Sequence, residues 1–582
     1  MRFIRFLTVS VLAAGCRSPS PAVAPAPTPA PTPAITASPP AGATRTGPVA
    51  SGYDLIIEGG RVVDGTGSPW FYGDLAVAAG RIVAVTPAGR LRSAETRERL
   101  DATGHVVAPG FIDIQSHSRE PLLVGDGRLV SKITQGITTE IMGESGTNAP
   151  QNAKTGGSGK FDFSGPRGFD HWLRAMESHG GSTNFGSFVG ATTVRMYAKG
   201  MAQGPATPAE LDTMRAVVRN AMEDGAFGVG SALIYPPASY VSTEELIEVS
   251  RAMAPYGGVY ITHMRSEADT WLEAIDEAMR IGREAGVPVE IFHLKAGGQR
   301  NWSKTIPAIA KINAARAAGQ DIQANMYLYP AGGTGLDACL PPWAAADGKL
   351  FNNLQDAKTR ARIRAEMDRD QLEWENLCQL ATPDGVLVLG LTREANKPLA
   401  GKRLAEIATI QGKAWQDVII DLLIAERQRI GTVYFLMDES NIRLKLQQPW
   451  IKFGTDAGGV DPDSNNVLVH PRSYGNFTRL LGKYVREEQV IPLEDAIRKA
   501  TSAVATRLSI MDRGVLRPGM WADIVVFNPV TVADHATFEN PHQLSVGIRE
   551  VFVNGVAVVR NERPTGALPG RIVRGPGWTG AP

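Results

Sequence analysis

The sequence contains few cysteines and almost no net charge. Only Cys16, Cys339 and Cys378 occur among 582 residues, and no Cys-x-x-Cys pair is present. A zinc site built from a Cys-x-x-Cys pair is therefore excluded, and no disulfide framework can be read from the two cysteines in the body of the chain. The formal net charge of +1 provides no concentrated basic surface for a phosphate backbone, which excludes nucleic acid as an expected partner.

The apolar run at the N-terminus is too short to cross a bilayer. Arg2 and Arg5 lie before the main part of this run, and Ala-Ala-Gly-Cys at 13–16 follows it. This is the layout of a secretory leader. The small residues before Cys16 resemble a bacterial lipobox and imply cleavage there and lipidation of the thiol. We expect a lipoprotein-type signal peptide at 1–16 and export to the periplasmic side of the bacterial cell envelope, with ordinary secretion or an inner-membrane anchor as the alternative.

The segment that follows has a composition that cannot form a core. Residues 17–50 are almost wholly Pro, Ala, Ser, Thr and Gly, and such chains favour extended, polyproline-like conformations. We predict a disordered tether. A membrane contact is expected only through the N-terminal lipid anchor.

Both ends of the remaining chain are rich in predicted strands. Residues 53–64 read as β-structure around a Gly-Gly turn, and residues 522–527 and 551–559 contain runs of β-branched residues. We expect the two ends, 53–108 and 515–562, to pair into one small β-sandwich domain.

The long middle segment alternates short apolar runs with helical stretches. A strand pattern at 258–262, a helical pattern at 273–284 and a strand pattern at 287–292 follow one another, the signature of repeated βα units. We predict an α/β fold, a (β/α)8 TIM barrel over 109–514. A charged helical stretch at 356–379 predicts a helical insertion near 340–385.

Polar residues stand where several of these predicted strands end. His117, His263 and His293 each follow an apolar run, and Asp456 ends a late strand. The carboxyl ends of barrel strands meet at one mouth, where such enzymes place catalysis. A lone histidine at a strand end is usually structural, but the chain has only nine histidines, and three of them occupy such places. Imidazoles and a carboxylate are ligands that hold zinc while leaving a position open.

Several motifs occur in the order seen in one known family. They are Ala-Pro-Gly-Phe-Ile-Asp at 108–113, Gln-Gly-Ile-Thr-Thr at 135–139, Gly-Ala-Phe-Gly-Val-Gly at 225–230, Leu-Ile-Tyr-Pro-Pro at 233–237, Thr-His-Met-Arg at 262–265, His-Leu-Lys at 293–295, Thr-Asp-Ala at 455–457, His-Pro-Arg at 470–472 and Gly-Met-Trp-Ala-Asp at 519–523. The chain resembles the amidohydrolase superfamily and, within it, the D-aminoacylase (N-acyl-D-amino-acid deacylase) group. The resemblance spans roughly residues 53–562 and implies a metal-dependent amide hydrolase.

Three positions depart from this family pattern. Gln115 stands at the first place of the usual His-x-His, Ser145 stands where a cysteine ligand is common, and Ala191 replaces a further histidine. Glutamine is a poor zinc ligand beside imidazole, so a fully ligated two-metal site is not expected. Glu144 is the predicted substitute ligand, with Ser145 as the alternative and a solvent-facing carboxylate as the plain structural reading.

The resemblance implies roles for the remaining site residues. Zinc, one or two ions with one tightly bound ion favoured, is expected on His263, His293 and Glu144 with help from His117, where it would activate water. Asp456 is expected to ligate metal, to act as general base and then acid, or to do both. The product implies a substrate carboxylate, for which Arg472, Lys295 and Tyr327 are the predicted partners; the oligomeric state is open.

Two other functions fit the same sequence. A dipeptidase or another amide or lactone hydrolase could use the same metal centre. A protein of another class, a barrel lipoprotein that has lost metal and catalysis, could serve as a binding module. Metal content and the activity of a His263→Ala variant separate these functions.

Overall fold

The computed structural model describes residues 52–156, 160–369, 373–463 and 467–580. The predicted signal peptide at 1–16, with its Cys16, and the predicted tether at 17–50 lie outside the described residues. Among the helices that are described, none has both the length and the apolar character that a membrane crossing needs.

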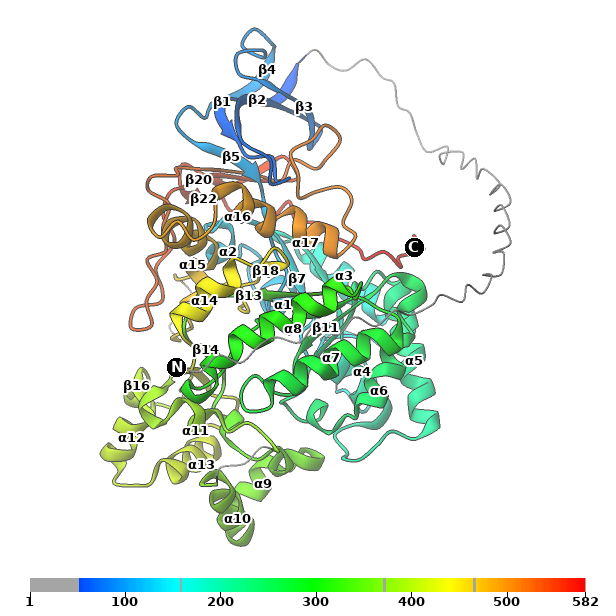
Figure 1. The fold of residues 1–582 in the computed structure, drawn as a ribbon, viewed down its shortest axis with the longest axis vertical. Coiled ribbons are helices and arrows are strands. Elements are labelled where there is room, and N and C mark those ends of the chain that lie inside the picture. Colours follow the sequence, from blue (N-terminus) through cyan, green and yellow to red (C-terminus); the bar gives the residue numbers. More distant parts are fainter. Residues whose placement is uncertain (1–51, 157–159, 370–372, 464–466, 581–582) are drawn as a thin grey trace, which may run out of the picture. The chain divides into compact units, whose positions relative to one another are not determined.

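Strands from both ends of the described chain form one nine-stranded sheet, in the order β22-β21-β20-β19-β5-β1-β2-β3, with β4 paired to β1. Figure 1 shows β1 to β5 beside β20 and β22. The strands are β1 (Tyr53–Val62), β2 (Phe71–Ala78), β3 (Arg81–Pro87), β4 (Thr96–Asp101), β5 (Val106–Pro109), β19 (Ile524–Phe527), β20 (Ile548–Val553), β21 (Val556–Arg560) and β22 (Arg563–Pro564). The central pairing joins β5 to β19, so the two ends are part of the same sheet.

The Gly-Gly turn predicted near the start of this sheet is wrong. Gly59 and Gly60 lie inside β1, where the register against β2 shifts between Ile57 and Gly60. A Cβ at Gly60 would lie 2.5 Å from Val107 Cγ2, and Gly59 has a φ of +67°. The glycines therefore allow an irregularity within a strand and a close approach of β5.

The barrel strands are all parallel to their neighbours. They are β6 (Phe111–Asp113), β7 (Ile137–Met142), β8 (Asn184–Ser187) continued by β9 (Val189–Gly190), β10 (Gly228–Ala232), β11 (Val259–His263), β12 (Val289–Ile291), β13 (Ile322–Met326) and β18 (Ile451–Phe453). A parallel bridge between Ser116 and Ala457 joins the ends of β6 and β18 and closes the ring. The fold is the predicted (β/α)8 barrel with a β-sandwich.

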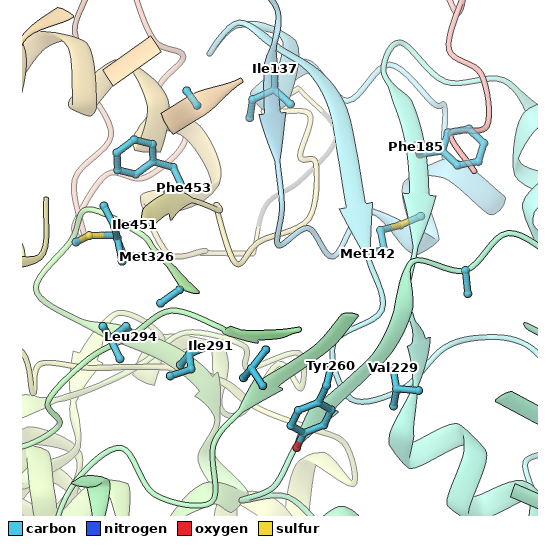
Figure 2. Packing of buried hydrophobic residues seen from close by; sticks show 14 of the residues in the cluster. Ile137, Met142, Phe185, Val229, Tyr260, Ile291, Leu294, Met326, Ile451 and Phe453 are labelled. Carbon is cyan, nitrogen blue, oxygen red and sulfur yellow. The ribbon is translucent and has the colours of Figure 1, made fainter. Parts of the chain in front are cut away.

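The strands are buried on both faces because helices cover the barrel from outside. In β11, Ile261 packs with Ile112 and Ile141 of the barrel interior. The neighbouring Tyr260 belongs to a second cluster, part of which Figure 2 shows. This outer cluster also contains Trp271 of the helix α7 (Trp271–Ala285). This arrangement explains why the strands read as continuous apolar runs.

Helices follow or precede the barrel strands along the sequence. They are α1 (Arg119–Leu123), α2 (Val130–Ile133), α3 (Gly168–His179), α4 (Ala191–Lys199), α5 (Pro208–Glu223), α6 (Thr243–Arg251), α7 (Trp271–Ala285), α8 (Thr305–Ala317), α14 (Glu439–Leu446), α15 (Arg472–Arg479), α16 (Leu493–Ala500) and α17 (Ser502–Arg507). The predicted helix at 273–284 lies within α7.

An inserted lobe, residues 332–436, lies between β13 and β18. Its sheet has the order β14-β17-β15-β16, and its own core includes Leu336, Ile363 and Leu436. The elements are β14 (Gly332–Gly335), α9 (Leu350–Gln355), α10 (Ala357–Met367), α11 (Leu377–Ala381), β15 (Val386–Val388), β16 (Lys402–Arg403), α12 (Leu404–Gln411), α13 (Trp415–Glu426) and β17 (Gly431–Tyr434). The sequence prediction placed a helical insertion near 340–385, within this lobe.

The lobe contains a disulfide bond between Cys339 and Cys378, which are 39 residues apart. This pairing could not be predicted, because the separation of two cysteines along the chain does not reveal their distance in space. The sequence makes no prediction for this pair, and only the structure shows the bond. The bond joins the start of the lobe to α11.

Candidate metal centre

The predicted ligands lie at one mouth of the barrel. His263 ends β11, His293 follows β12 and Glu144 follows β7, while His117 and Asp456 follow β6 and β18. The backbone turns sharply there: φ is +34° at His293 and +50° at Asp456. Positive φ is costly for residues with side chains and is concentrated at functional sites.

Glu144, His263 and His293 form the first cluster. Glu144 Oε1 lies 3.3 Å from His263 Nδ1 and 3.3 Å from His293 Nε2, and the ring centroids of the two histidines are 4.5 Å apart. The ligand atoms of all three lie within 4.8 Å of one another. Two buried imidazole nitrogens and a carboxylate oxygen that converge in this way are a donor set suited to zinc.

A further carboxylate, that of Glu267, supports both imidazoles from behind. Glu267 Oε1 lies 2.9 Å from His293 Nδ1, and Oε2 lies 3.4 Å from His263 Nε2. Lys295 Nζ lies 2.6 Å from the same His293 Nδ1, so the outer side of this ring faces both an ammonium and a carboxylate, and charged partners of this kind orient a ligand histidine. The inner nitrogens of both rings, His263 Nδ1 and His293 Nε2, face Glu144.

His117, Glu144 and Asp456 form a second cluster with ligand atoms within 4.8 Å of one another. His117 Nε2 lies 2.9 Å from Asp456 Oδ1 and 3.5 Å from Glu144 Oε2. Gln115 Nε2 donates to Glu144 Oε2 at 2.6 Å. Its amide therefore stands where the family pattern has an imidazole, and it leaves this second cluster with one strong nitrogen donor.

The charges of the site favour a cation at its centre. Burial opposes the ionisation of Glu144, but His293 and hydrogen bonds from His117 and His263 hold its pKa well below the usual range. Burial and Lys295 act to lower the pKa of His293, but Glu267 and Glu144 outweigh them and raise it to about 9. The field at this imidazole therefore stabilises positive charge, whether a proton or a metal ion.

The three predicted substrate-binding residues line the same cavity. Arg472 Nη1 lies 2.7 Å from Asp456 Oδ2, and its guanidinium lies over the ring of Tyr327 at 4.5 Å. Lys295 Nζ lies 2.7 Å from Glu267 Oε2. Both cations therefore already have an acidic partner, and their role toward a substrate carboxylate stays a prediction.

The structure also shows the surroundings of Ser145, Ala191 and His470. The hydroxyl of Ser145 lies 3.0 Å from that of Thr192, whereas Glu144 faces the two histidines. Ala191 begins α4 and is buried. His470 Nε2 donates to the carbonyl of Ala331 and Nδ1 accepts from Arg472 N–H, and burial lowers its pKa well below the usual range.

The cluster opens into a cavity of about 880 Å³. Barrel loops contribute Tyr235, whose ring lies 5.5 Å from that of His263, and Arg119. The inserted lobe contributes an apolar wall with Leu377 and Leu389, together with Glu375. The sequence reasoning missed Glu267, which a His-x-x-x-Glu spacing could have suggested, and Glu375, for which no local signal exists.

Comparison with known proteins agrees with this geometry. A model described as the amidohydrolase family matches residues 405–559. The barrel, the sandwich and the cluster of imidazoles and carboxylates at the strand ends define the class as that of metal-dependent amidohydrolases.

Individual relatives indicate which group of this family the chain belongs to. D-aminoacylase of Alcaligenes xylosoxydans xylosoxydans is 34% identical over 90% of this chain and 97% of its own length. N-acyl-D-aspartate deacylase of the same organism is 34% identical over 89% of this chain and 95% of its own length. The chain therefore belongs to the D-aminoacylase group of the amidohydrolase family.

Solved structures give the same result. The crystal structure of D-aminoacylase has a TM-score of 0.74 at 34% identity and covers 90% of this chain and 100% of its own. N-acyl-D-glutamate deacylase from Bordetella bronchiseptica, complexed with zinc and a phosphonate inhibitor, has a TM-score of 0.74 at 31% identity, with the same coverage.

Proposed function

We propose that this protein is a zinc-dependent hydrolase that deacylates N-acyl-D-amino acids. The observation that carries the proposal is the convergence of Glu144, His263 and His293. Glu144 Oε1 lies 3.3 Å from His263 Nδ1 and 3.3 Å from His293 Nε2. The cavity above this cluster also holds Asp456 and Arg472. Relatives that share its fold act on N-acyl-D-amino acids.

Glu144, His263 and His293 would hold the zinc ion. Zinc, when bound, lowers the pKa of a coordinated water and polarises a carbonyl oxygen. The carboxylate of Glu267 lies 2.9 Å from His293 Nδ1 and 3.4 Å from His263 Nε2, and a carboxylate in this position would help to orient both rings toward the ion. The donor set of this chain thus fits one zinc ion.

Asp456 would transfer the proton. Burial raises the pKa of Asp456, but Arg472 and a hydrogen bond from His117 outweigh burial and lower it, so the group is a carboxylate at neutral pH. It would accept a proton from water as the new C–O bond forms. It would return that proton to the amine nitrogen as the C–N bond breaks.

Arg472 and Tyr327 would orient the amino-acid half of the substrate. Arg472 Nη2 lies 3.1 Å from the carbonyl of Gly333, which fixes the guanidinium at the edge of the cavity. A guanidinium can bind a carboxylate through two parallel hydrogen bonds. The apolar side chains of the inserted lobe, among them Leu377 and Leu389, offer a surface for the acyl chain.

A hydrolysis panel tests this function. The purified protein is assayed for metal content and against paired N-acyl-D- and N-acyl-L-amino acids, dipeptides and lactones. We expect about one zinc ion per chain and release of free D-amino acid, with little activity on the L-substrates. Preference for dipeptides or lactones would favour the alternative hydrolase, and a protein without metal or activity would be a binding module.

We also propose that one zinc ion suffices. A study of D-aminoacylase describes one-metal activation and second-metal attenuation at its binuclear centre. In this chain Gln115 occupies a ligand place of the second cluster and is hydrogen-bonded to Glu144. An amide is a weaker zinc ligand than imidazole, so the second site should bind metal poorly.

Finally, we propose export and lipid anchoring at Cys16. The support is the leader at 1–16 and the disulfide of the lobe, since such bonds persist in oxidising compartments. The test is cell fractionation of a bacterium that expresses the full chain. We expect the wild type in the membrane fraction and a Cys16→Ser variant outside it; equal distribution of both proteins would contradict the lipid anchor.

A further inference from the structure

We propose that Glu375 of the inserted lobe is a positioning residue for the metal centre, acting through Glu267. The inference rests on the proposed zinc-dependent function. The inserted lobe supplies none of the proposed metal ligands. Under this proposal it helps to keep those ligands in position.

Glu375 binds the backbone around Glu267. Its Oε1 accepts hydrogen bonds from Ser266 Oγ at 2.5 Å, from Glu267 N–H at 2.7 Å and from Ala268 N–H at 2.8 Å. Burial is the largest influence on the pKa of Glu375 and, with the nearby Glu267, raises it to about 7 against the effect of these hydrogen bonds. In either protonation state the oxygen accepts from three donors and fixes the turn that they belong to. This turn follows His263 at the end of β11.

On the other side of the turn, Glu267 contacts the metal centre. Its carboxylate lies 2.9 Å from His293 Nδ1 and 2.7 Å from Lys295 Nζ. A rotation of the backbone at Glu267 would therefore change the support of a proposed ligand. Outer partners of ligand histidines typically contribute about 10- to 100-fold to metal affinity or activity.

Contacts within the lobe fix the chain next to Glu375. The next residue, Asn376, is buried and caps α11, with Oδ1 accepting from Cys378 N–H at 3.1 Å and from Gln379 N–H at 3.2 Å. Its Nδ2 donates to the carbonyl of Met367 in α10 at 3.1 Å. Cys378 is joined to Cys339.

The test compares the full-length protein with Glu375→Ala and Glu375→Gln variants. Each is loaded with zinc and dialysed against increasing concentrations of a chelator, and the retained zinc, kcat and KM are measured. For Glu375→Ala we expect loss of zinc at a chelator concentration about 10-fold lower and a fall in kcat of about 10-fold, with KM nearly unchanged. Glu375→Gln should be intermediate, because its amide oxygen still accepts hydrogen bonds.

Glu366→Gln is the matched control. Glu366 lies on α10 of the same lobe, where it accepts from Trp343 Nε1 at 2.6 Å and from Arg362 Nε at 2.9 Å. Zinc retention and kcat should remain at the wild-type level in this variant. Equal losses in Glu366→Gln and Glu375→Gln would mean that only the stability of the lobe matters, and would overturn the proposal.

A double-mutant cycle tests the path through Glu267. If Glu375 acts through it, adding Glu375→Gln to Glu267→Gln should cause no further loss of zinc, whereas additive losses would contradict the path. Wild-type retention of zinc by both Glu375 variants would also overturn the proposal. A wild-type protein that retains no zinc would instead overturn the proposed function. Should Glu375→Ala not fold, Glu375→Gln, which keeps the side-chain shape, decides the outcome.

Discussion

Asp456 lies between the side chains of Arg472 and His117, with its two oxygens 2.7 Å from Arg472 Nη1 and 2.9 Å from His117 Nε2. These contacts keep it ionised and hold its carboxylate beside the first cluster. We predict that Asp456→Asn lowers kcat by about 10²- to 10⁴-fold, the usual contribution of a proton-transferring group. Zinc content should persist, because the first cluster does not include this residue.

Steady-state kinetics with metal analysis checks this prediction. Asp276→Asn is the control, because Asp276 pairs with Lys311 away from the cavity. A variant with full activity would remove Asp456 from the mechanism, and loss of zinc together with activity would make it primarily a ligand.

Gln115 is the residue that limits the second cluster. We predict that Gln115→His raises the zinc content from about one ion per chain toward about two, because imidazole is a far better zinc ligand than an amide. Metal analysis at increasing zinc concentrations measures this. The Gln115→Ala variant, which loses the amide without gaining a ligand, should keep a zinc content of about one ion per chain. An unchanged zinc content in Gln115→His would contradict the assignment of this cluster.

Lys445 is buried, and its Nζ donates to the carbonyl of Leu294 at 2.7 Å. Burial and the nearby charge of Lys295 lower its pKa from 10.5 to about 7. Between these pH values the unfolded chain binds more protons, so this lysine makes the free energy of unfolding rise with pH by up to about 1.4 kcal/mol per pH unit. The stability is therefore reduced below pH 7 and regained as pH approaches 10.5.

We predict that Lys445→Met flattens this dependence. Denaturant unfolding at pH 7, 8 and 9 should show a smaller rise in the free energy of unfolding for the variant than for the wild type. Lys311→Met, at a partly buried lysine of α8 that pairs with Asp276, is the control and should leave the slope unchanged. Parallel slopes for Lys445→Met and the wild type would show that the lysine is protonated in the folded state.

At the scale of single residues, the sequence identified the side chains that end strands. His263, His293 and Asp456 could be found because an apolar run followed by a polar residue is a local pattern. Glu267 and Glu375 lie in loops, and their roles depend on contacts with residues that the pattern does not reveal. Glu375 is 108 residues from Glu267 along the chain.

Among the elements, the inserted lobe depends on its disulfide. The bond closes a segment of 39 residues, and a cross-link of this length restricts the unfolded chain by about 3 to 4 kcal/mol. We predict that a Cys339→Ala/Cys378→Ala variant unfolds at a lower denaturant concentration, seen first in the lobe.

Limited proteolysis with sequencing of the fragments measures this effect. Cleavage within 332–436 should become faster in the variant, while cleavage of the barrel should not. A treatment of the wild type with reductant should reproduce the change. Identical cleavage of both proteins would mean that the lobe core of Leu336, Ile363 and Leu436 suffices without the bond.

The strands show where local patterns are reliable. Val259–His263 and Ile524–Phe527 are buried along their whole length, and their runs of apolar residues were recognisable. The predicted turn at Gly59 and Gly60 was wrong for a non-local reason. Two adjacent glycines usually mark a turn, but here they let β5 approach β1. The competing requirement was long-range packing.

In the whole molecule, the C-terminal segment 566–580 packs against the barrel. Val573 N–H donates to the carbonyl of Phe185 at 2.7 Å and Gly570 N–H to that of Gly181 at 2.8 Å. The side chain of Val573 joins the interior cluster with Phe227 and Ile261. The segment therefore closes the end of the barrel opposite to the metal centre, where β8 and β10 begin.

We predict that a chain truncated after Thr565 has a melting temperature lower by at least several degrees, because it exposes this interior cluster to water. Calorimetry measures the change, and removal of only 581–582 is the control. Zinc content of the folded fraction should stay at the wild-type level, since the segment is remote from the ligands. An unchanged melting temperature would contradict a structural role.

The sequence by itself determined the barrel, the sandwich formed by both ends and the polar residues at the strand ends, because strand periodicity and the position of a residue at the end of a strand are local properties. Tertiary structure alone decided that Glu267 supports two histidines, that Glu375 reaches it from the lobe and that Cys339 meets Cys378. Those contacts join residues far apart along the chain, and their formation depends on the packing of the complete fold.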